Sequence, residues 1–223
     1  MLTKEINIEK SLSDHLISLI NHDIRAPMKN FAYFLSLYEK EEIGNQNFDF
    51  IEMLQVFFNS SSFLMENYIL WKRIIDRQLG YKQDSFVLLP IANEIKVAFL
   101  SYLVDKQVHL GFNFDTNQCL ETSEEVFRFV LKNVIYTILN YSNKGNAVYV
   151  ELKEEGKCLE VRSIDLFIPP GKLAFMFNME EYKNVSGKDI GVLLSIHLLK
   201  IFNGEILYEQ YDSGESIFKL YFN

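Results

Sequence analysis

The sequence is poor in cysteine, with only Cys119 and Cys158 among its 223 residues. The two form no CxxC pair and have no histidine at ligand spacing, which excludes the common zinc-binding classes. Two thiols do not make a disulfide framework, so the sequence favours a reducing compartment. We therefore expect a cytoplasmic protein with no metal centre of its own.

Long hydrophobic runs and positive charge are also scarce. No stretch of about 18 apolar residues occurs, so we expect no membrane segment in the chain. The first ten residues, MLTKEINIEK, lack the apolar core of a signal peptide. With 22 Lys and Arg against 30 Asp and Glu, the net charge is −8. Because phosphate binding needs a basic surface, we expect no nucleic-acid partner.

Apolar residues are plentiful and recur at helical spacing in the first third of the chain. Two segments, about 11–40 and 48–79, keep a spacing of three and four residues, and Gly44 lies between them. The predicted seams run Ile17, Ile20, Ile24, Met28, Phe31, Phe34/Leu35, Tyr38 and Phe50, Leu54, Phe57, Ser61, Leu64, Tyr68, Trp71, Ile75. Residues 1–80 are therefore predicted to form an antiparallel helical hairpin that dimerises into a four-helix bundle.

From residue 85 to 223 the pattern changes to mixed helices and strands, which predicts an α+β fold. Thr122 and Glu125 have the spacing of a capping box at the start of a helix. Gly204 is predicted to stop the helix that precedes the last two strands. The expected helices are 90–104, about 123–142, 171–178 and 189–203, and the expected strands are 108–114, 147–153, 158–164, 205–211 and 216–222.

The stretch NHDIRAPM, residues 21–28, places a His-Asp pair and a proline within the first helix. His22 lies about 140° from the apolar seam, so it is predicted to face water. His22, Asp23, Arg25 and Pro27 resemble the phosphoacceptor site of the sensor histidine kinase family. The resemblance implies that His22 attacks phosphorus and that Asp23 takes or orients the ring proton. Many members have Thr, Ser or Asn where this chain has Ala26, so phosphatase activity is not expected.

Residues 85–223 resemble the ATP-binding domain of the same family, an α/β sandwich shared with gyrase. NVIYTILNY matches its N box and implies nucleotide contacts by Asn133 and Tyr141, but Thr137 replaces the usual Mg²⁺-binding Asn. GKDIGV matches the phosphate loop through Gly187 and Gly191, but Asp189 replaces its middle Gly. A carboxylate there repels a triphosphate, so Gly187 and Gly191 are better explained by ordinary loop and helix-start geometry than by phosphate binding.

A third box departs further from the family. VRSIDLFIPP puts Ser163 at the adenine-binding Asp and Phe167 at a Gly, where the phenyl ring is expected to fill the adenine slot. Asp165 lies one pleat too far along to replace the missing Asp. His15, His109 and His197 match no box and are predicted to be surface or strand histidines.

Three functions remain open at this point. In the first, His22 exchanges phosphoryl groups with the aspartates of response-regulator receiver domains, and no cofactor is needed. In the second, the chain is a sensor histidine kinase that uses ATP and Mg²⁺ in a divergent site. In the third, it is a catalytically silent dimerisation or docking module. All three share a homodimer, and the first two share a receiver domain as partner.

Overall fold

The fold is given by a computed structural model that describes residues 10–18, 47–76, 84–153, 156–178, 185, 187 and 189–222. In helix α2, Asn47–Asp76, the side chains of Phe58 and of residues 61–76 are described. The predictions for residues 19–46, which include His22, Asp23, Ala26 and Pro27, lie outside the described residues.

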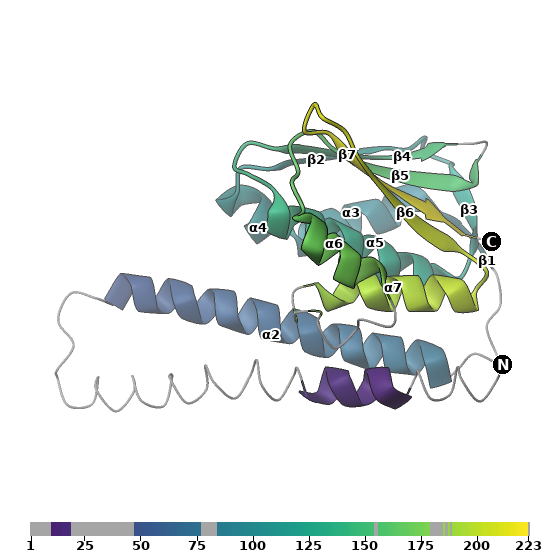
Figure 1. The fold of residues 1–223 in the computed structure, drawn as a ribbon. Helices are drawn as coiled ribbons and strands as arrows, with labels where there is room; N and C mark the ends of the chain where they lie inside the picture. The colour runs from purple at the N-terminus through teal and green to yellow at the C-terminus, as the bar shows by residue number, and fades with distance from the viewer. Residues whose placement is uncertain are drawn as a thin grey trace.

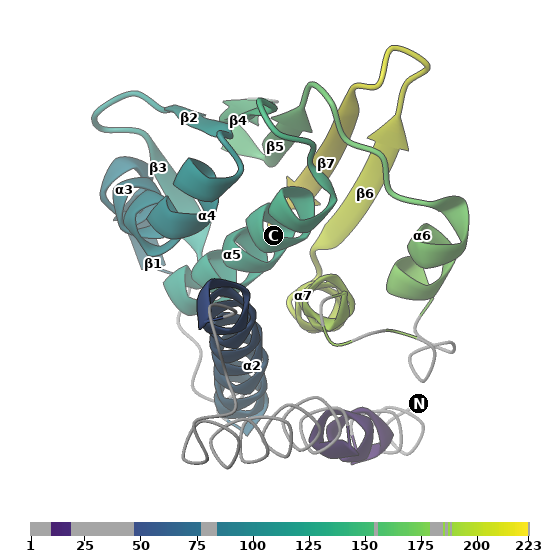
Figure 2. The same ribbon diagram turned by 90° about the vertical axis from the view of Figure 1, so that its left-hand side faces the viewer.

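Helix α2 and the helical segment 10–18 lie side by side (Figures 1 and 2). Leu12 and Leu16, one helical turn apart, are fully buried. The Ser13 hydroxyl lies 3.5 Å from the Tyr68 hydroxyl of α2. The predicted seam of α2 is confirmed where its side chains are described: Ser61, Leu64, Trp71 and Ile75 are buried and Tyr68 is half-buried.

Ile17 is predicted to lie in the apolar seam of the first helix, but the structure does not bury it. Its side chain is exposed because the Leu12–Leu16 face turns towards the rest of the chain. Three apolar residues of α2 are also exposed, and their spacing of seven and four residues places them on one helical face. We call Ile17, Phe58, Met65 and Ile69 the hairpin stripe.

The second part of the chain contains a five-stranded sheet of order β2-β4-β5-β7-β6 and a small sheet in which β1 pairs with β3. β2 and β4 are parallel, and every other pairing is antiparallel. The strands are β1 Asp84–Val87, β2 His109–Asn113, β3 Cys119–Thr122, β4 Ala147–Lys153, β5 Cys158–Ser163, β6 Glu205–Gln210 and β7 Ser216–Tyr221. The helices are α3 Leu88–Ala98, α4 Leu100–Asp105, α5 Glu124–Tyr141, α6 Pro170–Phe177 and α7 Ile190–Ile201.

The elements stack in layers, with the sheet above, α5 and α7 beneath it, and α2 beneath them (Figure 1). Alternation along each strand sends apolar side chains such as Val150, Val161 and Phe218 into the core. The other face of the sheet carries ion pairs, among them Arg162 with Glu215 at 3.2 Å. Because α5 lies between the sheet and α2, it is buried on two sides, and its polar residues Asn133 and Thr137 are shielded from water.

Three boundaries differ from the sequence predictions. Ser123 caps α5 by accepting a hydrogen bond from the Val126 amide, whereas Thr122 ends β3. The helix predicted for 90–104 is broken at Phe99, which has non-helical backbone angles of −100° and 8°. After α7, Asn203 takes the left-handed conformation with φ of 59°. Gly204 instead lets the chain pass close to the backbone of Tyr221 on β7. A Cβ on Gly204 would lie 2.3 Å from the Tyr221 carbonyl oxygen.

Helix α2 is joined to α7 by Trp71, whose indole N–H donates to Nδ1 of His197 over 3.4 Å. His197 is a half-buried residue of helix α7, which differs from its prediction as a surface or strand histidine. His109 is an exposed strand residue, as predicted. Burial, with a smaller contribution from the charge of Lys200, lowers the pKa of His197 to about 4.

This lowered pKa predicts a specific loss of stability in acid. An unfolded imidazole titrates near 6.5, so on acidification the unfolded chain takes up the proton before the folded one. Stability is therefore lost as the pH falls from about 6.5 to 4, by roughly 2 kcal/mol from this group. Urea unfolding at about pH 7 and pH 4.5 should show a smaller loss for His197→Gln, which keeps an acceptor for Trp71. Equal losses in both proteins would contradict this.

Candidate functional site

The residues matched to the N box lie on one face of α5 at a spacing of four. Asn133, Thr137 and Tyr141 all point towards the layer that holds α7 and α2. Asn133 is 1% exposed and Thr137 is 0% exposed, so neither side chain faces solvent. The predicted nucleotide face of α5 is thus an interior contact surface.

Asn133 is bonded within the protein. Its Nδ2 donates to Oδ1 of Asn67 on α2 over 3.0 Å and to the Phe129 carbonyl oxygen over 2.9 Å. The sequence did not indicate this partner, because Asn67 is 66 residues away and a single Asn on a helix has no periodic signal. The residue predicted to contact nucleotide therefore holds the hairpin helix.

Gly191, from the matched phosphate loop, lies directly against Asn133. A Cβ added to Gly191 would lie 2.1 Å from Oδ1 of Asn133, so only glycine permits this approach of α7 to α5. Gly187 lies in the turn before α7 and is half-buried.

Asp189 places a carboxyl group at the start of α7. Its Oδ1 accepts a hydrogen bond of 2.8 Å from the Tyr141 hydroxyl, and its Oδ2 lies 3.8 Å from the Lys172 ammonium nitrogen. The side chain is almost fully buried. Burial of Tyr141, followed by its hydrogen bond to Asp189 and the charge of that carboxylate, raises the pKa of the phenol. An internal carboxylate thus lies where the positive end of a helix would attract a phosphate.

Ser163 is fully buried and points into a polar network of loop residues. Its hydroxyl accepts a hydrogen bond of 2.7 Å from Nδ2 of Asn146. The Asn146 Oδ1 in turn accepts from the amides of Ala147 and Asp165, at 2.7 and 3.0 Å. Ser163 therefore joins the ends of β4 and β5. The Asp165 carboxylate pairs with Asn143 at the surface and does not replace the missing Asp.

The exposure of Phe167 also differs from the sequence prediction. The ring predicted to fill an adenine slot is 61% exposed, whereas Leu166 and Ile168 on either side are buried. Alternation along an extended segment turns the middle residue outward when its neighbours point inward. The motif match aligns Phe167 with a Gly of the family, but it carries no information on which way the Phe167 side chain points.

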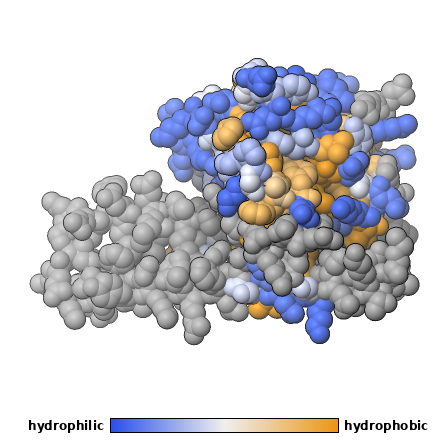
Figure 3. Space-filling view, viewed as in Figure 1, coloured by the Kyte–Doolittle hydropathy of each residue, from blue (hydrophilic) through white to orange (hydrophobic). Residues whose placement is uncertain are grey.

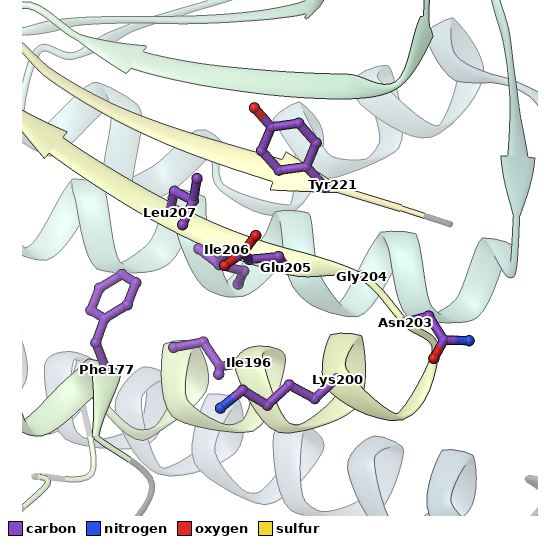
Figure 4. A pocket seen from close by; sticks show the side chains of 9 residues that line it. All are labelled: Phe177, Ile196, Lys200, Asn203, Gly204, Glu205, Ile206, Leu207 and Tyr221. Atoms are coloured by element: carbon purple, nitrogen blue, oxygen red, sulfur yellow. The ribbon is translucent and has the colours of Figure 1, made fainter.

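A surface groove of about 600 Å³ lies elsewhere, between α7 and the edge strand β6 (Figure 4). Phe177 of α6, Ile196 and Lys200 of α7 and Leu207 of β6 are among the residues that line it. In the space-filling view an apolar area lies where α6, α7 and β6 meet, below the hydrophilic face of the sheet (Figure 3). No residue matched to an ATP box lines the groove, so it is separate from the predicted nucleotide site.

Two further features of the described residues bear on the site. The described residues contain no cluster of three His, Cys, Asp or Glu side chains that could hold a metal ion. None of their helices combines the length and apolarity that crossing a bilayer requires. His22 and Asp23 lie outside the described residues, so their roles stay predictions.

No protein-family model and no curated protein matches this sequence. Solved structures do match. Histidine kinase AdeS of Acinetobacter baumannii is 14% identical with a TM-score of 0.65, over 91% of this chain and 97% of that one. A bacterial phosphotransferase is 15% identical with a TM-score of 0.53, over 94% of this chain and 95% of that one. The catalytic domain of histidine kinase ThkA is 14% identical with a TM-score of 0.52, over 64% of this chain and 97% of that one.

These likenesses show the fold of the chain. The α+β part, with its mixed sheet over α5 and α7, has the architecture of histidine kinase catalytic domains. The matches to AdeS and to the phosphotransferase extend over more than nine-tenths of the chain. The resemblance predicted from the sequence motifs is thereby confirmed at the level of the fold.

The altered nucleotide-binding boxes predict weak nucleotide binding. Loss of three contacts worth about 1.5 kcal/mol each weakens ATP roughly a thousandfold, from micromolar to millimolar dissociation constants. Calorimetry with Mg-ATP near 100 μM should detect no binding, while a kinase with intact ATP boxes binds under the same conditions. A micromolar dissociation constant for this protein would contradict the prediction and favour the active-kinase function.

Proposed function

We propose that this protein is a histidine phosphotransferase of two-component signalling that works without ATP. His22 takes a phosphoryl group from the aspartyl phosphate of one receiver domain and passes it to the aspartate of another. One observation supports the proposal most: residues that match the nucleotide-binding boxes make contacts inside the protein. Asn133 is bonded to Asn67, and Gly191 is packed against Asn133.

The proposed chemistry balances without a nucleotide. A neutral imidazole nitrogen of His22 attacks phosphorus, the bond from phosphorus to the carboxylate oxygen of the donor aspartate breaks, and that carboxylate leaves. The N–H of the phosphorylated ring is held by Asp23. The acyl phosphate supplies the free energy, and groups of the receiver domain neutralise most of the transition-state charge.

The two structural relatives that span nearly the whole chain point to the same signalling chemistry. One is named a histidine kinase and the other a bacterial phosphotransferase. Both names describe transfer of phosphoryl groups, but only a kinase requires ATP. The buried Asp189 carboxylate at the start of α7 favours the phosphotransferase, because it repels a triphosphate.

The alternative functions are separated from this one by a single labelling experiment. An active kinase acquires acid-labile label on His22 from labelled ATP alone. A phosphotransferase acquires it from a phosphorylated receiver domain and not from ATP. A silent module acquires it from neither donor.

We also propose a homodimer formed through the hairpin stripe. Phe58, Met65 and Ile69 follow one face of α2 and are exposed in the single chain, so a second copy gains apolar contact by covering them.

Light scattering coupled to gel filtration should give about twice the chain mass of 26.2 kDa at micromolar concentration. Met65→Glu places a charge on the stripe and should shift the mass towards that of a monomer. Val97→Glu, which is also an exposed apolar position but lies on α3, is the control and should remain dimeric. A monomeric wild-type protein would refute the dimer.

Substitution of His22 tests the site itself. His22→Gln should abolish label transfer and change the stability by less than about 0.5 kcal/mol, because the position is predicted to face solvent. Asp23→Asn should cause a much smaller loss of transfer, since an aspartyl phosphate already carries a good leaving group. Label exchange with a phosphorylated receiver domain is measured together with thermal melts. Undiminished transfer by folded His22→Gln protein would end the phosphoacceptor hypothesis.

A further inference from the structure

The contact between α2 and the ATPase-like domain is built like a protein interior. Leu64, Trp71, Ile74 and Ile75 of α2 are buried and belong to the same hydrophobic core as residues of α5 and α7. The rings of Phe63 on α2 and Tyr136 on α5 stack, with centroids 3.8 Å apart and an angle of 24° between their planes. The hairpin helix and the domain therefore share one core.

Two polar contacts fix the register of this packing. Asn67 and Asn133, 5% and 1% exposed, are joined by a hydrogen bond of 3.0 Å, and Trp71 donates to His197. If α2 slid or rotated on α5, both amides would stay buried without these partners, which is costly in a dry environment. The packing is thus stable in one register and unstable in neighbouring ones.

Charged pairs lie at the rim of the same contact. Lys132 of α5 is 3.7 Å from Glu66, and Arg73 of α2 is 3.3 Å from Glu125. These side chains are partly exposed, so the ion pairs orient α2 on α5 more than they stabilise the contact. An apolar and amide-bonded centre with a charged rim is the general anatomy of a specific protein contact.

We propose that the ATPase-like domain stays docked on α2 throughout the catalytic cycle and braces the hairpin. In a kinase, the nucleotide domain must carry a phosphoryl group to the histidine. Here the group arrives on a separate receiver domain, so no such movement is needed; this last step rests on the proposed function. The docking itself rests on the contacts of Asn67, Phe63 and Trp71.

Trp71 is a built-in reporter of the docking. It is the only tryptophan of the chain and is fully buried at the contact with α7. Acrylamide quenching of its fluorescence should be weak and should stay weak when a phosphorylated, tryptophan-free receiver domain is added. Urea-unfolded protein provides the upper limit of quenching. A rise towards that limit on addition of the receiver domain would overturn permanent docking.

A covalent clamp tests whether docking is compatible with activity. Glu66→Cys and Lys132→Cys replace an ion pair at the rim, in a Cys119→Ser background that removes the exposed native thiol. Joining the two new thiols with a short bis-maleimide should leave label transfer from a phosphorylated receiver domain unchanged. Each single-cysteine protein, treated with the same reagent, is the matched control. Transfer lost only in the clamped double variant would overturn the proposal.

The two experiments also separate this inference from the proposed function. If the unmodified protein transfers no label, the phosphotransferase function fails. The quenching of Trp71 still decides the docking, because it requires no transfer. Weak and constant quenching then supports a fixed domain in a protein of another activity, and strong quenching of the free protein refutes the docking as well.

Discussion

The arrangement of the molecule depends on one buried amide. Asn133 donates to Asn67 on α2, and its oxygen lies against Gly191, where a Cβ would come within 2.1 Å. One side chain therefore sets the distance between α5 and α7 and the register of α2 on both. A residue that resembles a nucleotide ligand in sequence thus makes a structural contact between three helices of this fold.

The other residues that match the ATP boxes also have contacts inside the protein. Once α7 packs against α5, polar groups that would face a ligand need internal partners, because unpaired buried groups are costly. The Asp189 carboxylate bonds with Tyr141, and the Ser163 hydroxyl bonds with Asn146. Thr137 and Asn133 are exceptions, since Oγ1 of Thr137 and Oδ1 of Asn133 have no hydrogen-bond partner among the described residues. Both of these buried acceptor atoms belong to residues of α5 that match the N box.

The sequence predicted those parts of the fold that have a strong local signal. Helix α5 and strands β4 and β5 have clear apolar periodicity, and their predicted ranges agree with the structure. Strands β1 and β3 were missed because each has only four residues, too few to show alternation. The partner of Asn133 and the outward turn of Phe167 depend on how distant segments pack, which no local spacing records.

The proposed permanent docking would give a physical reason for an ATPase-like fold in a protein that, as we propose, uses no nucleotide. A two-helix hairpin buries one seam and leaves its remaining faces to water, so it is only marginally stable by itself. Packing α2 on α5 and α7 buries Trp71, Ile74 and Ile75 and leaves the hairpin stripe, including Met65 and Ile69, uncovered. The domain can therefore stabilise one face of the hairpin while the opposite face stays available for a second copy. A domain that swung away would expose the Trp71 face each time, and the buried amide pair opposes that movement.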